Sequence, residues 1–383
     1  MKAANRIIIF FLLLTTYNLQ LMGCAADDIF PAIENNLANP LYITIDSNLN
    51  RAYLINSNNK YYYDTGALHV LDISTPTAPS LVTNGVTVLD SFSGETYLDS
   101  ANGFLYTANR LSDDNQDTTD RLLKINIDEA SANFLNIDEL TAGDNPFAMA
   151  ADLVNSILYV SNLGGTLDYY SLPEPSTPTS MSLADIALSD ETIIETSEPR
   201  DMAIIGSQAF VTLSDGGIFV IDLSEYDVDY YISDLASPRG IATDGAYLFV
   251  ANAEIDDNND YTYRLFVLDP STLTVRSENT DVTIVDKDDD SLLTAEVEID
   301  ADPEEVLVST DYIFVTNYDA DSVTVTNRVD FTKNTDITVG DEPFGMAVYS
   351  PAGVDTHLFV TNVQNNSVSI IDLSTLAVAA TYQ

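Results

Sequence analysis

One short phrase recurs seven times along the chain, and this repeat constrains the fold more than any other feature of the sequence. Each copy is an apolar pentapeptide, and six of the seven end in Asn. The copies are AYLIN (52–56), LYTAN (105–109), LYVSN (158–162), AFVTL (209–213), LFVAN (248–252), IFVTN (313–317) and LFVTN (358–362). Repeats of this kind are the signature of architectures that stack one supersecondary unit. We therefore expect seven similar structural units.

Each copy lies between other apolar runs. In the fifth unit PRGIAT (238–243) precedes it and RLFVLDPS (264–271) follows it, and most units end on a weaker run such as LAVAATY (376–382). Short runs rich in Val, Ile, Tyr, Phe and Thr, bounded by Asn, Asp, Gly and Pro, are typical of β-strands. Seven units of four strands predict an all-β fold, a seven-bladed β-propeller of four-stranded antiparallel blades.

The repeated phrases resemble the YVTN repeat family of seven-bladed β-propellers. The resemblance covers about residues 39–383 and implies the propeller fold. It implies no particular activity, because propellers host enzymes, binding proteins and scaffolds. No strand-like run is evident in residues 27–38, so the sequence leaves open how the ring closes. We expect the recurrent Asn to be structural, through left-handed geometry and bonds to the following turn.

The N-terminus resembles a bacterial lipoprotein signal peptide. A basic start precedes the apolar stretch IIIFFLLL, which is too short to span a bilayer, and then LMGC follows. LMGC looks like a lipobox, which implies cleavage before Cys24 and a lipid on its sulfur. Cys24 is the only cysteine, so it has no disulfide partner within the chain. The expected organisation is a signal peptide (1–23), an N-terminal tether (24–38) and a propeller (39–383).

The residues after Cys24 bear on localisation. Ala25 follows the cysteine, which by the sorting habit of bacterial lipoproteins indicates the outer membrane, and Asp27 and Asp28 resemble a surface-export signal. We expect a lipid-anchored protein of the cell envelope, at the outer membrane and facing the periplasm or the surface. Several acyl chains on one cysteine anchor stably, because each buried CH₂ contributes about 0.8 kcal/mol.

The charge balance limits the partners. The chain has 60 Asp plus Glu against 14 Lys plus Arg, a formal net charge of −46. A polyanion of this size repels DNA, RNA and anionic lipid head groups, so we expect no nucleic-acid partner. It attracts cations and cationic ligands, although solubility alone also explains such a composition.

The strand order places several residues at the mouth of the central channel. The turn between the second and third strands lies on the same face as the connector into the next blade. Residues just after the first-strand proline then enter the channel mouth, and in blade order they are Leu41, Thr96, Phe147, Arg200, Arg239, Glu304 and Phe344. Aromatic rings near these positions either line a binding surface or pack, and they are Tyr42, Tyr97, Phe147 and Phe344.

Two arginines occupy equivalent positions in adjacent blades. Guanidinium groups suit carboxylate or phosphate, so Arg200 and Arg239 are candidates to clamp an anionic group. Glu304 and Glu305 from a nearby blade would supply opposing charge. The alternative is that each arginine pairs with a local acid, such as Asp201 for Arg200.

Acidic turns on the same face are candidate calcium loops. Two of them match a D-x-N-x-D pattern, whose hard oxygen atoms suit Ca²⁺. The residues are Asp113, Asn115 and Asp117 in one turn and Asp256, Asn258 and Asp260 in the other. The Gly and Glu of an EF-hand loop are missing, and the alternative is a solvated turn in an acidic protein.

The chain contains no HExxH, CxxC, GxSxG or glycine-rich phosphate motif. We therefore favour a binding or interaction module that takes a small-molecule or protein ligand on its loop face, a layout similar to surface lipoprotein propellers that capture cobalamin. The alternative is a metal-dependent hydrolase similar to propeller lactonases, with Glu304 and Glu305 as ligands or general base. A third reading is an architectural envelope protein.

Overall fold

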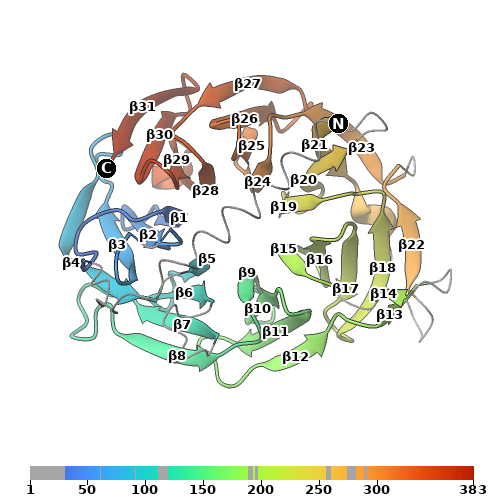
Figure 1. The fold of residues 1–383 in the computed structure, drawn as a ribbon, viewed down its shortest axis with the longest axis horizontal. Helices are drawn as coiled ribbons and strands as arrows, with labels where there is room; N and C mark the ends of the chain where they lie inside the picture. Colours follow the sequence, from blue (N-terminus) through green and yellow to red (C-terminus); the bar gives the residue numbers. More distant parts are fainter. Residues whose placement is uncertain are drawn as a thin grey trace, which may run out of the picture.

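The chain folds as a closed ring of seven antiparallel blades, which confirms the predicted fold class (Figure 1). The structure is a computed structural model, and it describes residues 31–60, 62–90, 92–110, 120–188, 193–194, 197–255, 260–273, 282–288 and 291–383. Within these ranges no helix is long and apolar enough to cross a membrane. The proposed signal peptide and Cys24 lie outside them.

In each blade the first strand lies innermost, and the fourth lies at the perimeter in all blades except blade 4, which has an additional outer strand (Figure 1). The strands of the first four blades are β1 (Pro40–Asp46), β2 (Arg51–Asn56), β3 (Gly66–Asp72) and β4 (Ser80–Leu89); β5 (Ser93–Asp99), β6 (Phe104–Asn109), β7 (Arg121–Asn126) and β8 (Ile137–Thr141); β9 (Pro146–Asp152), β10 (Ile157–Asn162), β11 (Thr166–Ser171) and β12 (Thr179–Ser182); β15 (Pro199–Ile205), β16 (Gln208–Leu213), β17 (Ile218–Asp222) and β18 (Asp227–Ser233).

The remaining blades follow the same order. Their strands are β19 (Pro238–Thr243), β20 (Leu248–Ile255), β21 (Tyr261–Leu268) and β23 (Leu293–Glu298); β24 (Pro303–Val308), β25 (Tyr312–Asn317), β26 (Ser322–Asn327) and β27 (Lys333–Thr338); β28 (Pro343–Tyr349), β29 (His357–Asn362), β30 (Ser367–Asp372) and β31 (Ala377–Tyr382). Two short 3₁₀ helices, η1 (Pro270–Thr272) and η2 (Pro351–Gly353), lie in connections.

Blade 4 carries an additional strand that local sequence does not predict. The connection between β21 and β23 of blade 5 contributes β22 (Thr283–Asp286), which pairs in parallel with the outer strand β18. A two-stranded hairpin, β13 (Ile186–Ala187) and β14 (Ile193–Ile194), precedes blade 4. The strand β22 thus lies along the perimeter of blade 4 (Figure 1).

The repeated phrase forms the second strand of each blade, where burial is greatest. Its aromatic residues, such as Phe210, Phe249 and Phe314, are fully buried between neighbouring blades. The proline that begins an inner strand pairs with the Asn that ends the second strand, as in Pro303 opposite Asn317. The connectors between blades and the turns between second and third strands therefore share one face, as predicted.

The recurrent Asn side chains are buried, but the expected left-handed geometry is wrong. None of these six asparagines has a positive φ, because each lies in an extended strand. Asn362 is representative. Its Nδ2 donates to the hydroxyls of Ser367 and Ser369 at 3.0 Å each, and its Oδ1 accepts from the backbone N–H of Gly340 at 3.0 Å. The amide thus joins the third strand to the connector that enters the blade.

The ring closes without strand exchange, because blade 7 supplies its own four strands and β1 is the inner strand of blade 1. The two blades lie side by side in Figure 1. Thr361 Oγ1 accepts from Gly345 N at 2.8 Å and donates to the carbonyl of Leu41 in blade 1 at 2.9 Å. A Cβ at Gly345 would lie 2.4 Å from that carbonyl oxygen, so this close approach requires glycine. Asn39 Nδ2 adds a bond to Val363 O at 3.1 Å.

Thr361→Val tests this closure. The substitution keeps the side-chain shape but leaves a buried carbonyl and a buried N–H without their partner, which costs about 2 kcal/mol of unfolding free energy. Chemical denaturation of Thr361→Val beside Thr361→Ser, which keeps the hydroxyl, measures the difference. Equal stability of the two variants would contradict this closure.

Candidate functional site

The channel mouth is built by a bulge that recurs at the start of the inner strands. In all seven blades the pairing register shifts directly after the residue that opens the inner strand. The next two residues leave the ladder in blades 2 to 7, whereas in blade 1 only Leu41 does, because Tyr42 pairs with Ile55. A β-bulge changes the direction in which side chains point. Here it turns two layers of side chains toward the channel: the residues directly after the opening residue form the upper layer, and the residues that follow them form the lower layer.

The upper layer contains an ion-pair triad formed by blades 4, 5 and 6. Arg200 Nη2 lies 2.7 Å from Glu304 Oε2, and Arg239 Nη1 lies 2.9 Å from Glu304 Oε1. Arg239 Nη2 also lies 3.5 Å from Asp302 Oδ1. The Glu304 side chain is only 9% exposed, so the pairing is well shielded. The structure thus brings both predicted arginines together on one predicted carboxylate.

A third arginine, which the sequence analysis missed, completes this layer. Arg110 directly follows the repeated phrase of blade 2, and its guanidinium lies 4.9 Å from the ring centre of Phe147. Arg200 lies over the same ring at 5.8 Å, within cation–π range. Arg110 Nε is buried and has no hydrogen-bond partner in the described part of the chain. Its position directly after the repeated phrase was the available sequence signal.

The lower layer contains three carboxylates from alternate blades. Each accepts a backbone N–H from the next blade: Glu95 Oε2 from Met149 at 2.7 Å, Asp201 Oδ2 from Ile241 at 2.8 Å, and Glu305 Oε2 from Met346 at 2.9 Å. The corresponding residues of blades 3, 5 and 7 are Ala148, Gly240 and Gly345, which are small enough for the acid to reach across.

Burial shifts the protonation of these carboxylates. Burial raises the pKa of Asp201 to about 6, against the opposing effect of two backbone hydrogen bonds and Arg200. It raises the pKa of Glu95 and of Glu305 well above the usual range, and repulsion from Asp201 adds to both shifts. The three groups therefore act on one another across the channel.

A small cavity lies between the two layers. Its volume is about 30 Å³, and residues of all seven blades line it: Tyr42, Glu95, Phe147, Ala148, Arg200, Asp201, Arg239, Gly240, Glu304, Glu305 and Phe344. Tyr42 is 9% exposed and packs edge-on against Phe344 at a ring-centre distance of 5.3 Å. Burial, and then the charge of Glu95, raise the pKa of its hydroxyl.

The expected register is wrong in blade 2. Ser93 occupies the proline position there, because it pairs with Asn109, so Gly94 and Glu95 follow it at the channel. Thr96 instead pairs with Thr107 in the ladder. Tyr97 packs away from the channel, 6.1 Å from the ring of Tyr106.

The structure does not show the alternative pairing of Arg200 with Asp201. Asp201 accepts backbone N–H groups from Met202 at 2.7 Å and from Ile241, whereas the Arg200 guanidinium binds Glu304.

The predicted calcium loops fall mostly outside the described residues. Asp113, Asn115, Asp117, Asp256 and Asn258 lie outside them, and Asp260 is an exposed residue just before β21. In the described ranges no three His, Cys, Asp or Glu side chains are grouped to hold a metal ion.

Both histidines lie in strands away from the channel. His69 in β3 is fully buried, and burial lowers its pKa to about 4, so it is neutral at physiological pH.

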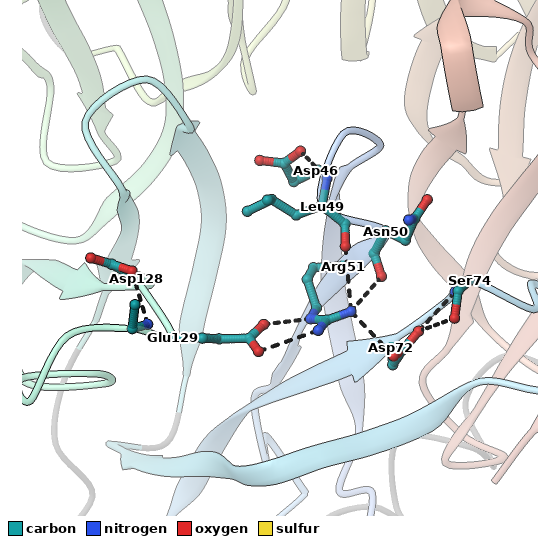
Figure 2. Close-up of polar contacts among 9 residues, drawn as sticks. Asp46, Leu49, Asn50, Arg51, Asp72, Ser74, Asp128 and Glu129 are labelled. Carbon is teal, nitrogen blue, oxygen red and sulfur yellow. Dashed lines mark hydrogen bonds and ion pairs between the residues drawn. The ribbon is translucent and has the colours of Figure 1, made fainter.

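A larger groove lies at the perimeter between blades 1 and 2, with a volume of about 640 Å³. Its arginine is already engaged, as Figure 2 shows: Arg51 Nε lies 2.5 Å from Glu129 Oε1, Nη2 lies 3.2 Å from Glu129 Oε2, and Nη1 lies 3.3 Å from Asp72. Arg51 also donates to the carbonyls of Leu49 and Asn50. We interpret this cluster as a clamp between blades, which leaves the channel mouth as the candidate site.

Comparison with known proteins supports the fold. No family model and no curated sequence matches the chain. Among solved structures, it is similar to Kuenenia stuttgartiensis Hydrazine Synthase, with a TM-score of 0.67, 14% identity, and coverage of 92% of this chain and 99% of that chain. It is also similar to the Myceliophteria thermophila Cps50 (Swd1) β-propeller domain, with a TM-score of 0.60, 9% identity, and coverage of 88% and 98%. At these identities the likeness shows the fold alone: the chain is a seven-bladed β-propeller.

Glu304→Gln tests the triad. A neutral amide cannot balance two shielded guanidinium groups, so we expect the unfolding free energy to fall by about 2 kcal/mol. Glu342→Gln is the matched control, because Glu342 pairs with Lys60 at 2.6 Å but is 28% exposed, and exposed pairs contribute about 1 kcal/mol or less. Chemical denaturation measures both, and a Glu304→Gln loss no larger than the control would contradict a shielded triad.

Proposed function

We propose that this propeller is a lipid-anchored binding module of the cell envelope, which holds a carboxylate- or phosphate-bearing ligand or partner at the channel mouth of its loop face. One observation carries the proposal: Arg110, Arg200 and Arg239 converge there in a chain with 14 basic residues against 60 acidic ones. Basic groups this scarce are otherwise spread along the sequence, whereas these three come from three blades to one place.

The triad leaves donors for a ligand. One carboxylate, Glu304, serves two guanidinium groups, each of which carries five N–H donors in a planar fork. Arg239 Nε is buried without a hydrogen-bond partner among the described residues, as is Arg110 Nε. We infer that an anionic ligand group binds the two guanidinium groups, either beside Glu304 or in its place, and accepts hydrogen bonds from these N–H donors.

The overall charge narrows the ligand class. A net charge of −46 repels simple anions at a distance. A ligand that carries its carboxylate or phosphate together with a positive group avoids most of this repulsion. Such a ligand also suits the acidic layer beneath the arginines.

The anchor and the family remain part of the proposal. We infer lipidation at Cys24 from the LMGC sequence, outer-membrane placement from Ala25, and membership of the YVTN repeat family from the seven phrases. Calcium at the acidic turns belongs to the same set of inferences. The alternative function is a lactonase-like, metal-dependent hydrolase that uses Glu304 and Glu305, and the engagement of Glu304 by two arginines favours the binding module over it.

Anion titrations test the site. We expect acetate and inorganic phosphate, titrated calorimetrically, to bind the protein weakly and to bind Glu304→Gln about tenfold more tightly, because a competing charge-assisted bond is removed. Arg200→Gln and Arg239→Gln should lose the binding. Lys333→Gln removes the same charge at the outer strand β27, where Lys333 pairs with Asp336 at 2.7 Å, and should leave it unchanged. Loss in Lys333→Gln equal to that in the arginine variants would reject the site.

Palmitate labelling tests the anchor. Cells that express the chain should incorporate labelled lipid into the protein and retain it in the membrane fraction, whereas Cys24→Ser should do neither. Protease treatment of intact cells then reports whether the propeller faces the surface. Equal labelling of the Cys24→Ser protein would show that this cysteine is not the anchor.

A further inference from the structure

The lower part of the channel-mouth cavity, beneath Arg200, Arg239 and Glu304, is acidic, and we call this part the chamber. Its walls are the carboxylates of Glu95, Asp201 and Glu305 together with the hydroxyl of Tyr42, and all four side chains line the cavity of about 30 Å³. About 10 to 15 Å³ suffices for one water molecule. The chamber therefore holds a group of that size, such as an ammonium head, without rearrangement.

We propose that this chamber binds a primary ammonium group, held by Glu95, Asp201 and Glu305 and by Tyr42. The proposal deepens the proposed function and rests on it only in placing the ligand in the same channel.

The acceptors match the donors of such a group. The carboxylates come from blades 2, 4 and 6, so they are spread around the channel axis rather than gathered on one side. A primary ammonium group presents three N–H donors and no acceptor. One oxygen of Glu95 and one of Glu305 has no hydrogen-bond partner among the described residues, since only Oε2 of each accepts a backbone bond.

Tyr42 supplies independent support for a ligand. Its side chain is buried to nine-tenths, and its hydroxyl makes no hydrogen bond with any residue that the structure describes. The charges of Glu95, Glu305 and Asp201 all act on this hydroxyl, so it lies with them around the chamber. The hydroxyl oxygen is not among the fully buried atoms that lack a partner, so it is accessible from the cavity that the side chain lines, and a bound polar group would hydrogen-bond to it there.

A chelated metal ion suits the chamber less well. The described part of the chain has no three carboxylates close enough together to hold a metal. An ammonium group makes longer contacts through its hydrogen atoms and requires no such grouping. Its alkyl tail would leave past Phe147 and Phe344, toward the guanidinium groups of the triad. A ligand with an amine at one end and a carboxylate or phosphate at the other fits both layers.

The carboxylates are held in place whether or not a ligand is bound. Each is tied to a backbone N–H of the next blade. Replacement of Glu by Gln keeps an acceptor oxygen for that bond and removes the charge. Glu95→Gln and Glu305→Gln are therefore expected to fold, which allows the role of charge in ligand binding to be measured separately from blade packing.

Calorimetric titration with methylammonium chloride tests the proposal. We expect binding that weakens about tenfold or more in Glu95→Gln and in Glu305→Gln, as expected for loss of a charge-assisted bond. Tyr42→Phe, which keeps the ring against Phe344, should weaken it less. Because protons compete for carboxylates of raised pKa, affinity should increase from pH 5 to pH 8, and binding should release protons, as measured in buffers of different ionisation enthalpy.

The controls separate the alternatives. Tetramethylammonium has no N–H donor and should not bind. Nα-acetyllysine methylamide, tested beside methylammonium, separates a free small amine from a lysine side chain presented by a partner protein. Arg239→Gln should lose acetate binding and keep methylammonium binding. A result that contradicts the proposed anion site can therefore be distinguished from one that contradicts the proposed ammonium site. No methylammonium binding to the folded protein, equal binding of K⁺ or tetramethylammonium, or unchanged affinity in both Gln variants would overturn the proposal.

Discussion

The structure depends on how each inner strand satisfies the backbone groups that its bulge releases. A bulge takes residues out of the ladder, and buried N–H and C=O groups without partners are costly. In blades 3, 4 and 7 the hydroxyl in the repeated phrase meets this need. Ser161, Thr212 and Thr361 each accept an N–H in their own blade at 2.8 to 3.1 Å and donate to a carbonyl of the next at 2.9 to 3.2 Å. The last of these bonds closes the ring, so the closing interface resembles the internal ones.

In alternate blades the carboxylates of the lower layer provide hydrogen-bond partners for backbone N–H groups near the bulges. This role also determines where the acidic side chains of the site lie. Glu95, Asp201 and Glu305 are placed at the axis because each must reach a backbone N–H of its neighbour. Their remaining oxygen capacity faces the channel, in surroundings where burial disfavours charge. Arg200 directly precedes Asp201 in its bulge, Arg239 takes the equivalent position in blade 5, and Arg110 joins them from the turn after β6. An architectural requirement thus produces two adjacent layers of opposite charge on one axis.

Much of this was predictable from the sequence, and the failures have physical causes. The seven phrases give the number of blades because each buries one complete second strand. The proline marks the start of the inner strand in six blades, which correctly placed Arg200, Arg239 and Glu304 at the channel. Blade 2 begins with Ser93 instead of proline, so the predicted register of its inner strand was wrong and Glu95 was missed. Arg110 was missed because it lies in a turn, where the spacing of residues does not predict which way a side chain points. The strand β22 pairs with a different blade, and such a contact leaves no local pattern.

The central claim is that acidic side chains of one blade bind the backbone of the next around the axis. Amide hydrogen exchange followed by NMR tests it at three residues, Met149, Ile241 and Met346. If the claim holds, these amides exchange as slowly as neighbouring ladder amides, although each directly follows a bulge, and substitution of the partner acid by Ala selectively speeds up the corresponding amide. Rapid exchange of all three in the folded protein would contradict the account.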